Sequence, residues 1–367
     1  MLNLTEILNA ENKRDSHKNS LVEKFVSEEN TFTRFLLGRN EHSMTLAKLF
    51  KIDGFVDDFT ADVFWNGKPV IKSEKLPDNA IVINCSMSIS PVTASQKLQQ
   101  LKIKTGGCLN YSDLLALKPE LIPAPAFVAE MHEDIKKNEA HWLSLSEKFA
   151  DAESVKVFND LIRYRLTADP AHMVDYSTRL SDQYFESFLS LNNEVFVDAG
   201  GFDGDTTEEF CKRYPTYKKV ILFEPSEKNM LNAKKRLANR RDIEFITQGI
   251  SDTSGTLSFN SDAGSASAVS SEGACTIEVT TLDETVKEKV TFIKMDLEGW
   301  EIKALEGCKQ HITEDHPKLA ISIYHSASDF WRVPEYILSL RQDYDVYLRH
   351  YTEGWSETVM FFLPSSL

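Results

Sequence analysis

The sequence predicts an α/β fold with two Rossmann-like parts, and three observations support this prediction. Its 367 residues exceed the roughly 150 that one domain usually needs, which favours two domains. Apolar runs of strand length, such as residues 195–197 and 220–223, alternate with segments of helical periodicity. The first of these runs leads into a turn rich in glycine and aspartate, at residues 198–204. Such alternation is typical of a mainly parallel sheet with helices on both faces.

We expect four segments along the chain. Residues 1–30 form a helical lead-in, residues 31–125 a small Rossmann-like α/β domain, residues 126–191 a helical connector, and residues 192–367 the larger α/β domain. Within the small domain, the patterns predict strands and helices at residues 35–37, 43–49, 52–56, 81–84 and 93–101. The small domain has no phosphate-binding fingerprint, so partner docking or homo-oligomerisation is favoured over ligand binding as its role.

The composition excludes several classes of function. With 56 acidic and 41 basic residues, the net charge of −15 argues against nucleic acid or an anionic membrane surface as a partner. No apolar stretch approaches the roughly 18 residues of a membrane span, and the first residues lack a signal-peptide pattern, so we expect a cytoplasmic protein. The five cysteines are scattered, odd in number and without a C-x-x-C pair, which predicts reduced thiols rather than disulfides or a zinc site.

The turn from Asp198 to Gly204 is the first candidate binding feature. Gly200 can adopt a positive φ, Gly204 permits a close strand-to-helix contact, and Asp198 places a carboxylate at the end of a strand. A dinucleotide fingerprint would need glycines where this chain has Phe202 and Asp205, so the pyrophosphate of NAD fits poorly.

The charges around this turn favour a ligand that carries positive charge. Asp203 and Asp205 repel phosphate and suit the sulfonium and amino groups of S-adenosylmethionine. The next strand stops at Glu224, 26 residues beyond Asp198, where a carboxylate can accept both ribose hydroxyls. Ser251 or Asp252, which follow a strand at residues 243–246, can reach an adenine edge. The predicted cofactor-binding residues are Asp198, Gly200, Gly201, Asp203, Gly204, Glu224, Ser251, Asp252 and Asp296.

A second apolar strand, residues 292–295, delivers Asp296 and Glu298 to its carboxyl end. A further strand at residues 318–324 ends at His325, so Asp296 and His325 are predicted to border the same crevice as the glycine turn. His325 is the first choice for a general base, because an imidazole titrates near neutral pH. Asp296 or Glu298 is the alternative base or the partner that orients the histidine.

Three further features have two interpretations each. Asp296, Glu298 and Asp203 offer oxygen ligands, but side chains two apart at a strand end need not converge, so no metal is expected. Residues 261–273 either close over an acceptor or simply connect strands at residues 256–259 and 276–279. The pair Tyr184 and Phe185 either walls the cofactor pocket or packs in the core, and core packing is favoured.

Four segments in this order resemble the FkbM-type S-adenosylmethionine-dependent O-methyltransferases: residues 196–206 (FVDAGGFDGDT), 223–225 (FEP), 281–283 (TLD) with 293–299 (IKMDLEG), and 321–325 (ISIYH). The resemblance covers the chain from about residue 184 onward. It implies a seven-stranded methyltransferase sheet whose last two strands, residues 345–350 and 358–363, form an antiparallel pair. It also implies S-adenosylmethionine as cofactor and a hydroxyl acceptor, often on a sugar or polyketide.

The expected function is therefore methyl transfer from S-adenosylmethionine to a hydroxyl of a sugar, glycan or glycosylated small molecule. Two alternatives stay open at this point. One is an NAD-dependent sugar-modifying oxidoreductase, against which the missing glycine fingerprint counts. The other is a non-catalytic nucleotide-sugar-binding protein of glycan assembly, against which the intact motifs count.

Overall fold

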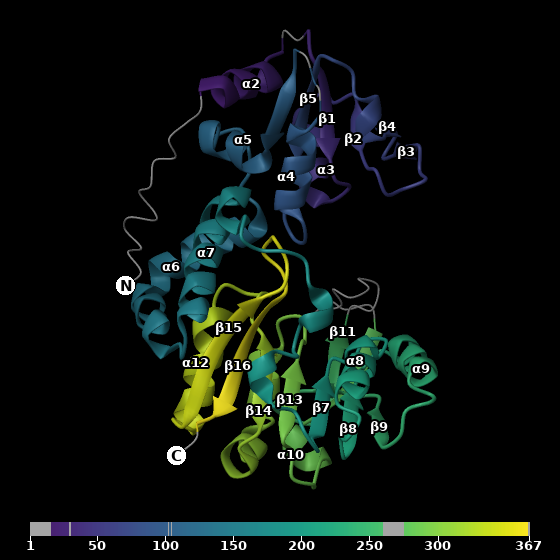
Figure 1. Cartoon of the computed structure of the whole chain (residues 1–367), viewed down its shortest axis with the longest axis vertical. Coiled ribbons are helices and arrows are strands. Elements are labelled where there is room, and N and C mark those ends of the chain that lie inside the picture. The colour runs from purple at the N-terminus through teal and green to yellow at the C-terminus, as the bar shows by residue number, and fades with distance from the viewer. Residues whose placement is uncertain (1–15, 29–30, 102, 104, 260–274, 366–367) are drawn as a thin grey trace. The chain divides into compact units, whose positions relative to one another are not determined.

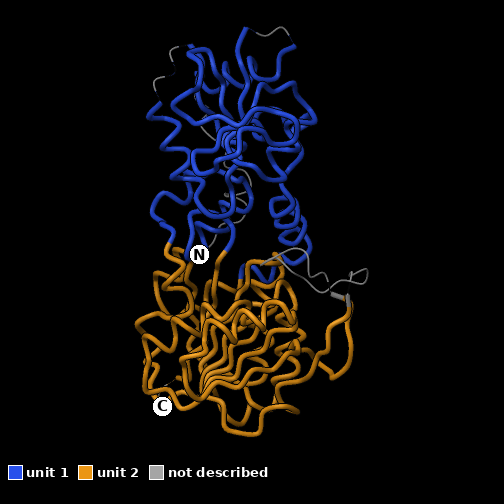
Figure 2. Tube along the Cα trace, turned by 90° about the vertical axis from the view of Figure 1, so that its right-hand side faces the viewer, with its two compact units in different colours: residues 1–143, 158–178, 351–356 blue, residues 144–157, 179–350, 357–367 orange. Residues whose placement is uncertain are grey.

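The computed structural model describes residues 16–28, 31–101, 103, 105–259 and 275–365, which divide between two compact units. Unit 1 lies within residues 1–143, 158–178 and 351–356, and unit 2 within residues 144–157, 179–350 and 357–367 (Figure 2). No helix among the described residues has the length and apolar character that a bilayer crossing requires. The predicted loop at residues 261–273 falls outside the described part of the chain.

Unit 2 is built on a seven-stranded sheet with the order β15-β16-β14-β13-β7-β8-β9 (Figure 1). Only β16 runs antiparallel to its neighbours β14 and β15, whereas the remaining pairs are parallel. This confirms the seven-stranded sheet and the antiparallel final pair that the resemblance implied. The strands are β7 (Val195–Ala199), β8 (Lys219–Phe223), β9 (Ile243–Ile246), β13 (Phe292–Met295), β14 (Lys318–Ser322), β15 (Tyr344–His350) and β16 (Thr358–Pro364).

Both faces of the central strands of this sheet are covered. Their sequences are therefore continuous apolar runs and do not alternate between apolar and polar residues. All four residues of β13 are buried, as are four of the five in β7 and in β8. Helices follow the strands as predicted: α8 (Asp205–Arg213), α9 (Glu227–Arg236), α10 (Leu282–Thr285), α11 (Glu301–Glu306) and α12 (Asp329–Leu340). Ser226 caps α9 by accepting a hydrogen bond from the amide of Asn229.

A smaller sheet of unit 2 has the order β10-β12-β11, with β10 at Gly249–Ile250, β11 at Gly255–Phe259 and β12 at Cys275–Thr280. The strands β11 and β12 pair antiparallel, with Thr256 opposite Glu278. The strands predicted on either side of residues 261–273 are therefore confirmed.

Unit 1 contains a six-stranded sheet with the order β3-β4-β2-β1-β5-β6. All its pairs are parallel except β3 with β4, which confirms a Rossmann-like small domain. Its strands are β1 (Thr33–Leu37), β2 (Gly54–Val56), β3 (Phe64–Trp65), β4 (Lys68–Ile71), β5 (Ala80–Asn84) and β6 (Gly107–Asn110). Its shorter helices are α2 (Ser16–Val26), α3 (Glu41–Leu49), α4 (Pro91–Gln99) and α5 (Tyr111–Leu117).

Two long helices, α6 (Ala126–Leu145) and α7 (Ala152–Thr167), follow the small sheet. The prediction of helix as far as residue 191 is wrong beyond Thr167. From there the chain forms 3₁₀ turns at residues 170–173, 180–182 and 187–189. Ala168, Tyr184 and Ser190 have positive φ angles, a conformation that cannot continue a right-handed helix.

The glycine turn has the backbone that its sequence predicts. Gly200 has a φ of +76°, and a Cβ atom added there would lie 2.0 Å from the carbonyl oxygen of Asp296. Gly204 has a φ of +85°, and a Cβ atom added there would lie 3.2 Å from Ala233 in α9, so its close contact is with the neighbouring helix. Because these two glycines have no side chains, the chain can turn tightly after β7, between β13 and α9.

Replacement of Gly200 tests this close packing. We expect Gly200→Ala to lower the free energy of unfolding by more than about 2 kcal/mol, because left-handed strain alone costs about 1–2 kcal/mol and a backbone clash is added. Gly255→Ala is the control, since nothing lies within 4 Å of its added Cβ. Urea denaturation should show a change below about 0.5 kcal/mol for the control. Equal effects of the two substitutions would contradict the packing described here.

Candidate functional site

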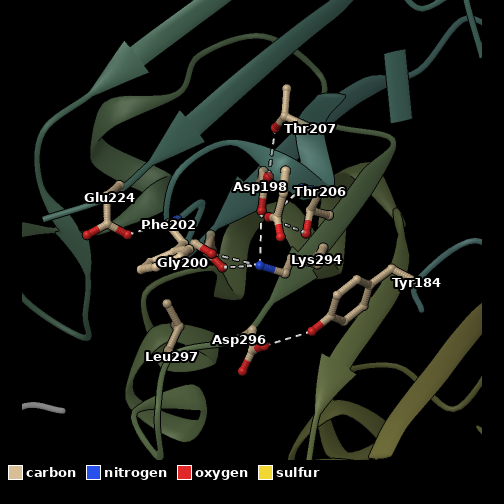
Figure 3. Close-up of polar contacts among 12 residues, drawn as sticks. Tyr184, Asp198, Gly200, Phe202, Thr206, Thr207, Glu224, Lys294, Asp296 and Leu297 are labelled. Atoms are coloured by element: carbon tan, nitrogen blue, oxygen red, sulfur yellow. Dashed lines mark hydrogen bonds and ion pairs between the residues drawn. The ribbon is translucent and has the colours of Figure 1, made fainter. Parts of the chain in front are cut away.

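Several predicted site residues lie at the carboxyl edge of the unit 2 sheet, where ligands bind in open α/β folds; Figure 3 shows Asp198, Glu224 and Asp296 among them. Asp198 lies near the end of β7, Glu224 follows β8, and Asp296 follows β13. His325 comes three residues after β14. The sheet order places β7, β8, β13 and β14 side by side, so the four side chains border one edge.

A buried ion pair lies beneath the glycine turn. The ammonium of Lys294 lies 3.1 Å from the carboxylate of Asp198, and the two side chains are 2% and 0% exposed. Lys294 also donates a hydrogen bond to the carbonyl oxygen of Gly200, at 2.8 Å, and Thr207 donates one to Asp198, at 2.7 Å (Figure 3). Burial raises the pKa of Asp198. Burial would lower the pKa of Lys294, but the attraction between its ammonium and the Asp198 carboxylate outweighs this effect and raises that pKa. Lys294 therefore stays charged and ties β13 to the turn.

This geometry gives Asp198 a different place from the one its sequence position suggests. With no exposed surface, its carboxylate holds Lys294 and Thr207 and does not face a ligand directly. Lys294 was not among the residues predicted for the site. The sequence does contain a sign of its role, because a lysine within the otherwise apolar run of β13 needs a buried partner for its charge. A role of Asp198 in binding the cofactor through the turn stays a prediction.

Glu224 joins the end of β8 to the same turn. Its carboxylate accepts hydrogen bonds from the amides of Phe202, at 3.0 Å, and Ser226, at 2.9 Å, and from the side chain of Asn229, at 3.4 Å. Burial raises its pKa, and these hydrogen bonds oppose that rise. An ionised carboxylate has about four acceptor positions, so Glu224 retains capacity for a ribose hydroxyl.

The remaining predicted cofactor residues have partners of their own. Asp203 forms an ion pair with Arg236, at 2.5 Å, and Asp252 forms one with Lys303, at 2.9 Å. Ser251 donates to Asp252 and accepts a hydrogen bond from the indole of Trp300, at 3.2 Å. Contact of these residues with the cofactor stays a prediction.

Two tyrosine hydroxyls bind the carboxylate of Asp296. Tyr184 donates to one oxygen at 2.8 Å, and Tyr324 donates to the other at 3.4 Å (Figure 3 shows the first contact). Tyr184 is 3% exposed and has a φ of +71°, a conformation that costs energy for a residue with a side chain. Its ring also lies 5.2 Å from the ammonium of Lys294. The sequence favoured core packing for this tyrosine, but the structure shows that it is both buried and bonded to a site carboxylate.

His325 lies among three carboxylates. Its Nε2 atom is 3.2 Å from Glu298 and 3.5 Å from Asp296, and its Nδ1 atom is 3.1 Å from Glu301. Burial would lower the pKa of His325, but Glu298 and Glu301 raise it well above its ordinary value. The surrounding carboxylates therefore favour the protonated form of the imidazole. The reason for which sequence analysis chose His325 as base, a titration near neutrality, does not apply in this environment.

Further carboxyl groups surround this cluster. Burial raises the pKa of Glu298, and it raises the pKa of Asp329 to about 7 and that of Glu357 to about 7. The charge of neighbouring acids adds to this rise, with Asp296 acting on Glu357 and Glu301 on Asp329. Glu301, which sequence analysis did not assign, is fully buried. Such an excess of acids favours a ligand that brings positive charge.

Unit 1 has its own topological switch point, since β1 lies between β2 and β5. Residues 351–356 belong to this unit and fill the space next to α4. The Glu353 carboxylate accepts hydrogen bonds from the amide of Thr93, at 2.7 Å, and from its hydroxyl, at 2.5 Å. A Cβ atom on Gly354 would lie 2.2 Å from the carbonyl oxygens of Met87 and Ser88. A carboxylate of the chain thus occupies the helix N-terminus at which an anionic ligand would bind.

The strand order of unit 2, with its glycine turn and an acidic residue after the second strand, defines a Rossmann-like methyltransferase. Residues 198–352 match the family model described as methyltransferase FkbM domain. Residues 198–352 are therefore an FkbM-type methyltransferase domain, and S-adenosylmethionine is its methyl donor.

The methyltransferase FkbM from Methylobacillus flagellatus has a similar structure, with a TM-score of 0.74 and 23% identity over 95% of this chain and 93% of that one. This likeness extends over both units, so it includes the fold of unit 1, which the sequence resemblance did not reach. An rRNA methylase from Streptococcus thermophilus matches over 54% of this chain and 98% of its own, with 21% identity and a TM-score of 0.34. Fibrillarin from Aeropyrum pernix, with S-adenosylmethionine bound, matches over 52% and 76%, with 11% identity and a TM-score of 0.33. A comparison with curated proteins finds no match.

Removal of Lys294 tests the buried ion pair. We expect Lys294→Met to lower the free energy of unfolding by about 3–5 kcal/mol, because it leaves the Asp198 carboxylate buried without its counter-ion. Asp198→Asn in the same chain should recover at least about 1 kcal/mol of that loss, which denaturation of both single variants and the double variant measures. Strictly additive effects would show that the two charges are not coupled.

Glu357 should make stability depend on pH. Its folded pKa of about 7 exceeds its ordinary value of 4.5, so the folded state binds the proton more tightly and stability falls as pH rises between these values. We expect Glu357→Gln to remove up to about 3 kcal/mol of that fall when unfolding is compared at pH 4 and pH 8. Parallel stability curves for the wild type and the variant would contradict this assignment.

Proposed function

We propose that the protein methylates a hydroxyl group of a sugar, glycan or glycosylated small molecule. The observation that supports this proposal is the cluster of Asp296, Glu298 and His325, which follows β13 and β14 at the same edge as the glycine turn. An alcohol is a weak nucleophile and needs a group that accepts its proton. The cluster offers carboxylates for this task beside the expected position of the methyl donor.

The residues at this edge suit S-adenosylmethionine. Glu224 retains acceptor capacity, and the acidic groups near the turn favour a cationic ligand over a phosphate. When bound, the cofactor supplies a methyl group on a sulfonium sulfur that is already activated as a leaving group. Transfer would form a bond between the acceptor oxygen and the methyl carbon while the carbon–sulfur bond breaks. The electron pair of the broken bond would stay on the sulfur.

The side chains of the site have distinct tasks in this proposal. Asp296, held by the two tyrosine hydroxyls, orients the acceptor hydroxyl near the methyl group, since alignment supplies much of the acceleration in such displacements. Glu298 receives the hydroxyl proton, because the carboxylates around His325 favour its protonated form and leave it less able to accept a proton. The imidazolium stabilises the two carboxylates beside it.

Charge also favours a particular kind of acceptor. The carboxyl groups at residues 296, 298, 301, 329 and 357 would repel a phosphate placed next to the reacting hydroxyl. A neutral polyol such as a hexose avoids this repulsion and can use its other hydroxyls as hydrogen-bond donors to the carboxylates. We therefore infer that the methylated hydroxyl lies on a neutral sugar ring, away from any phosphate of the acceptor.

The alternatives have less support. An NAD-dependent oxidoreductase is disfavoured because residues 198–352 match a methyltransferase family. A nucleotide-sugar-binding role for unit 1 is disfavoured because Glu353 accepts the hydrogen bonds of Thr93 that a phosphate would use. Partner docking or self-association through unit 1, and a cytoplasmic location, stay predictions.

Ligand binding and methyl transfer test the proposal together. Calorimetry should detect S-adenosylhomocysteine binding at micromolar concentration, with no detectable binding of NAD at the same concentration. A screen with radiolabelled methyl donor should then find transfer to a neutral glycoside and slower transfer when a phosphate replaces a hydroxyl next to the methylated one. Transfer only to an amine or a carboxylate would overturn the proposal of a hydroxyl acceptor.

Variants of the cluster test the assigned roles. We expect Glu298→Gln to reduce kcat by about 10²–10⁴-fold, because general-base catalysis typically contributes that much. His325→Ala should also reduce kcat, because it removes the ring that pairs with the carboxylates of Asp296 and Glu298. The affinity for S-adenosylhomocysteine should stay within about threefold of the wild type. Glu288→Gln is the matched control, since this exposed carboxylate pairs with Lys219 outside the site. Activity of both cluster variants within threefold of the control would place the proton acceptor elsewhere.

A further inference from the structure

Three side chains of the cluster can each point one ligand atom at a common position. One oxygen of Asp296, one oxygen of Glu298 and one ring nitrogen of His325 lie within 4.8 Å of one another. We propose that these residues bind a divalent cation that prefers oxygen and imidazole ligands, such as Mg²⁺ or Mn²⁺. The inference deepens the proposed function and rests on it for the role of the cation, whereas the binding itself can be measured alone.

The histidine provides a second observation, independent of the acidic residues. The side chain of His325 is only 10% exposed, yet neither Nδ1 nor Nε2 forms a hydrogen bond with good geometry among the described residues. Its contacts with the carboxylates are ion pairs at 3.1–3.5 Å. A buried imidazole without directional partners is ready to coordinate a metal ion through Nε2, which faces Asp296 and Glu298.

The groups behind these three residues have the arrangement that supports metal ligands in other proteins. A metal-bound histidine usually donates its second ring N–H to a carboxylate, and ligating carboxylates are themselves hydrogen-bonded. Here Nδ1 of His325 lies 3.1 Å from Glu301, which is fully buried on α11. The carboxylate of Asp296 accepts a hydrogen bond from Tyr184, at 2.8 Å. The hydrogen bond from Tyr184 orients Asp296, and the ion pair with Glu301 lies at the ring nitrogen of His325 that the cation would not use.

The donor set selects the kind of cation. Two carboxylates and one imidazole, without a thiolate, suit hard cations that prefer oxygen. Three protein ligands leave coordination positions for water and for the oxygen of an acceptor hydroxyl. Such a cation would polarise the acceptor hydroxyl, whose proton would pass to the oxygen of Glu298 that does not bind the cation.

From the sequence, Asp203 was the third possible oxygen ligand beside Asp296 and Glu298, although no metal was expected. In the structure Asp203 forms an ion pair with Arg236 instead. In the proposed site the third ligand is His325, which follows the neighbouring strand β14. The sequence placed Asp296 and His325 at one crevice, and the structure adds the distances that make them candidate ligands of one cation.

Binding of Mn²⁺ to the full chain tests the inference without any assay of activity. Protein stripped with a chelator is titrated with Mn²⁺, and electron paramagnetic resonance measures the free ion, with and without S-adenosylhomocysteine. We expect one site per chain in the wild type and in the control Glu288→Gln. Affinity should fall at least tenfold in Glu298→Gln, and about 10–100-fold in Glu301→Gln, which alters only the residue behind His325. Circular dichroism verifies that each variant is folded.

The outcomes separate this inference from the proposed function. Absence of a stoichiometric Mn²⁺ site in the folded wild type, or a site whose affinity is unchanged in Glu298→Gln, overturns the inference. Transfer of methyl to a sugar that is unaffected by chelator would then show that the proposed function stands without a cation. A Mn²⁺ site that Glu298→Gln weakens, in a protein that methylates only acceptors other than hydroxyls, supports the cation and overturns the proposed function.

Discussion

The buried pair of Asp198 and Lys294 is the interaction on which the site depends. These residues face each other across the register of β7 and β13, and Lys294 extends the contact to the carbonyl oxygen of Gly200. Charges so fully removed from water are costly unless each is paired and hydrogen-bonded. Because the pair satisfies both charges only in one geometry, it fixes the glycine turn relative to β13. Asp296 follows the same strand, so one element holds both the turn and the acidic cluster.

The electrostatics of the edge follow from this arrangement. Lys294 is committed to the turn, and His325 is the imidazolium among a larger number of carboxyl groups. Acids that are buried with few compensating cations have raised pKa values, as Asp329 and Glu357 do. The methyl donor and the proposed divalent cation both bring positive charge to this place. The repulsion among these acids in the ligand-free protein thus favours binding of the methyl donor and of the proposed cation.

The sequence predicted much of the fold because its signals are local. Short apolar runs and the positive φ of Gly200 depend on nearby residues, and the structure confirms them. The site was predicted less completely, because its contacts join residues far apart in the chain. Tyr184 reaches Asp296 across 112 positions, and Glu301 contacts His325 only after two strands have paired. The raised pKa of His325 likewise arises from neighbours that the linear pattern does not place together.

The central claim is that the fixed turn and Glu224 hold the methyl donor at this edge of the sheet. A crystal structure with S-adenosylhomocysteine tests it most directly. The account predicts that the ribose hydroxyls lie within hydrogen-bond distance of the Glu224 carboxylate and that the sulfur points toward Asp296. Density for the ligand elsewhere in the chain, with the turn and Glu224 in contact only with protein atoms, would contradict it.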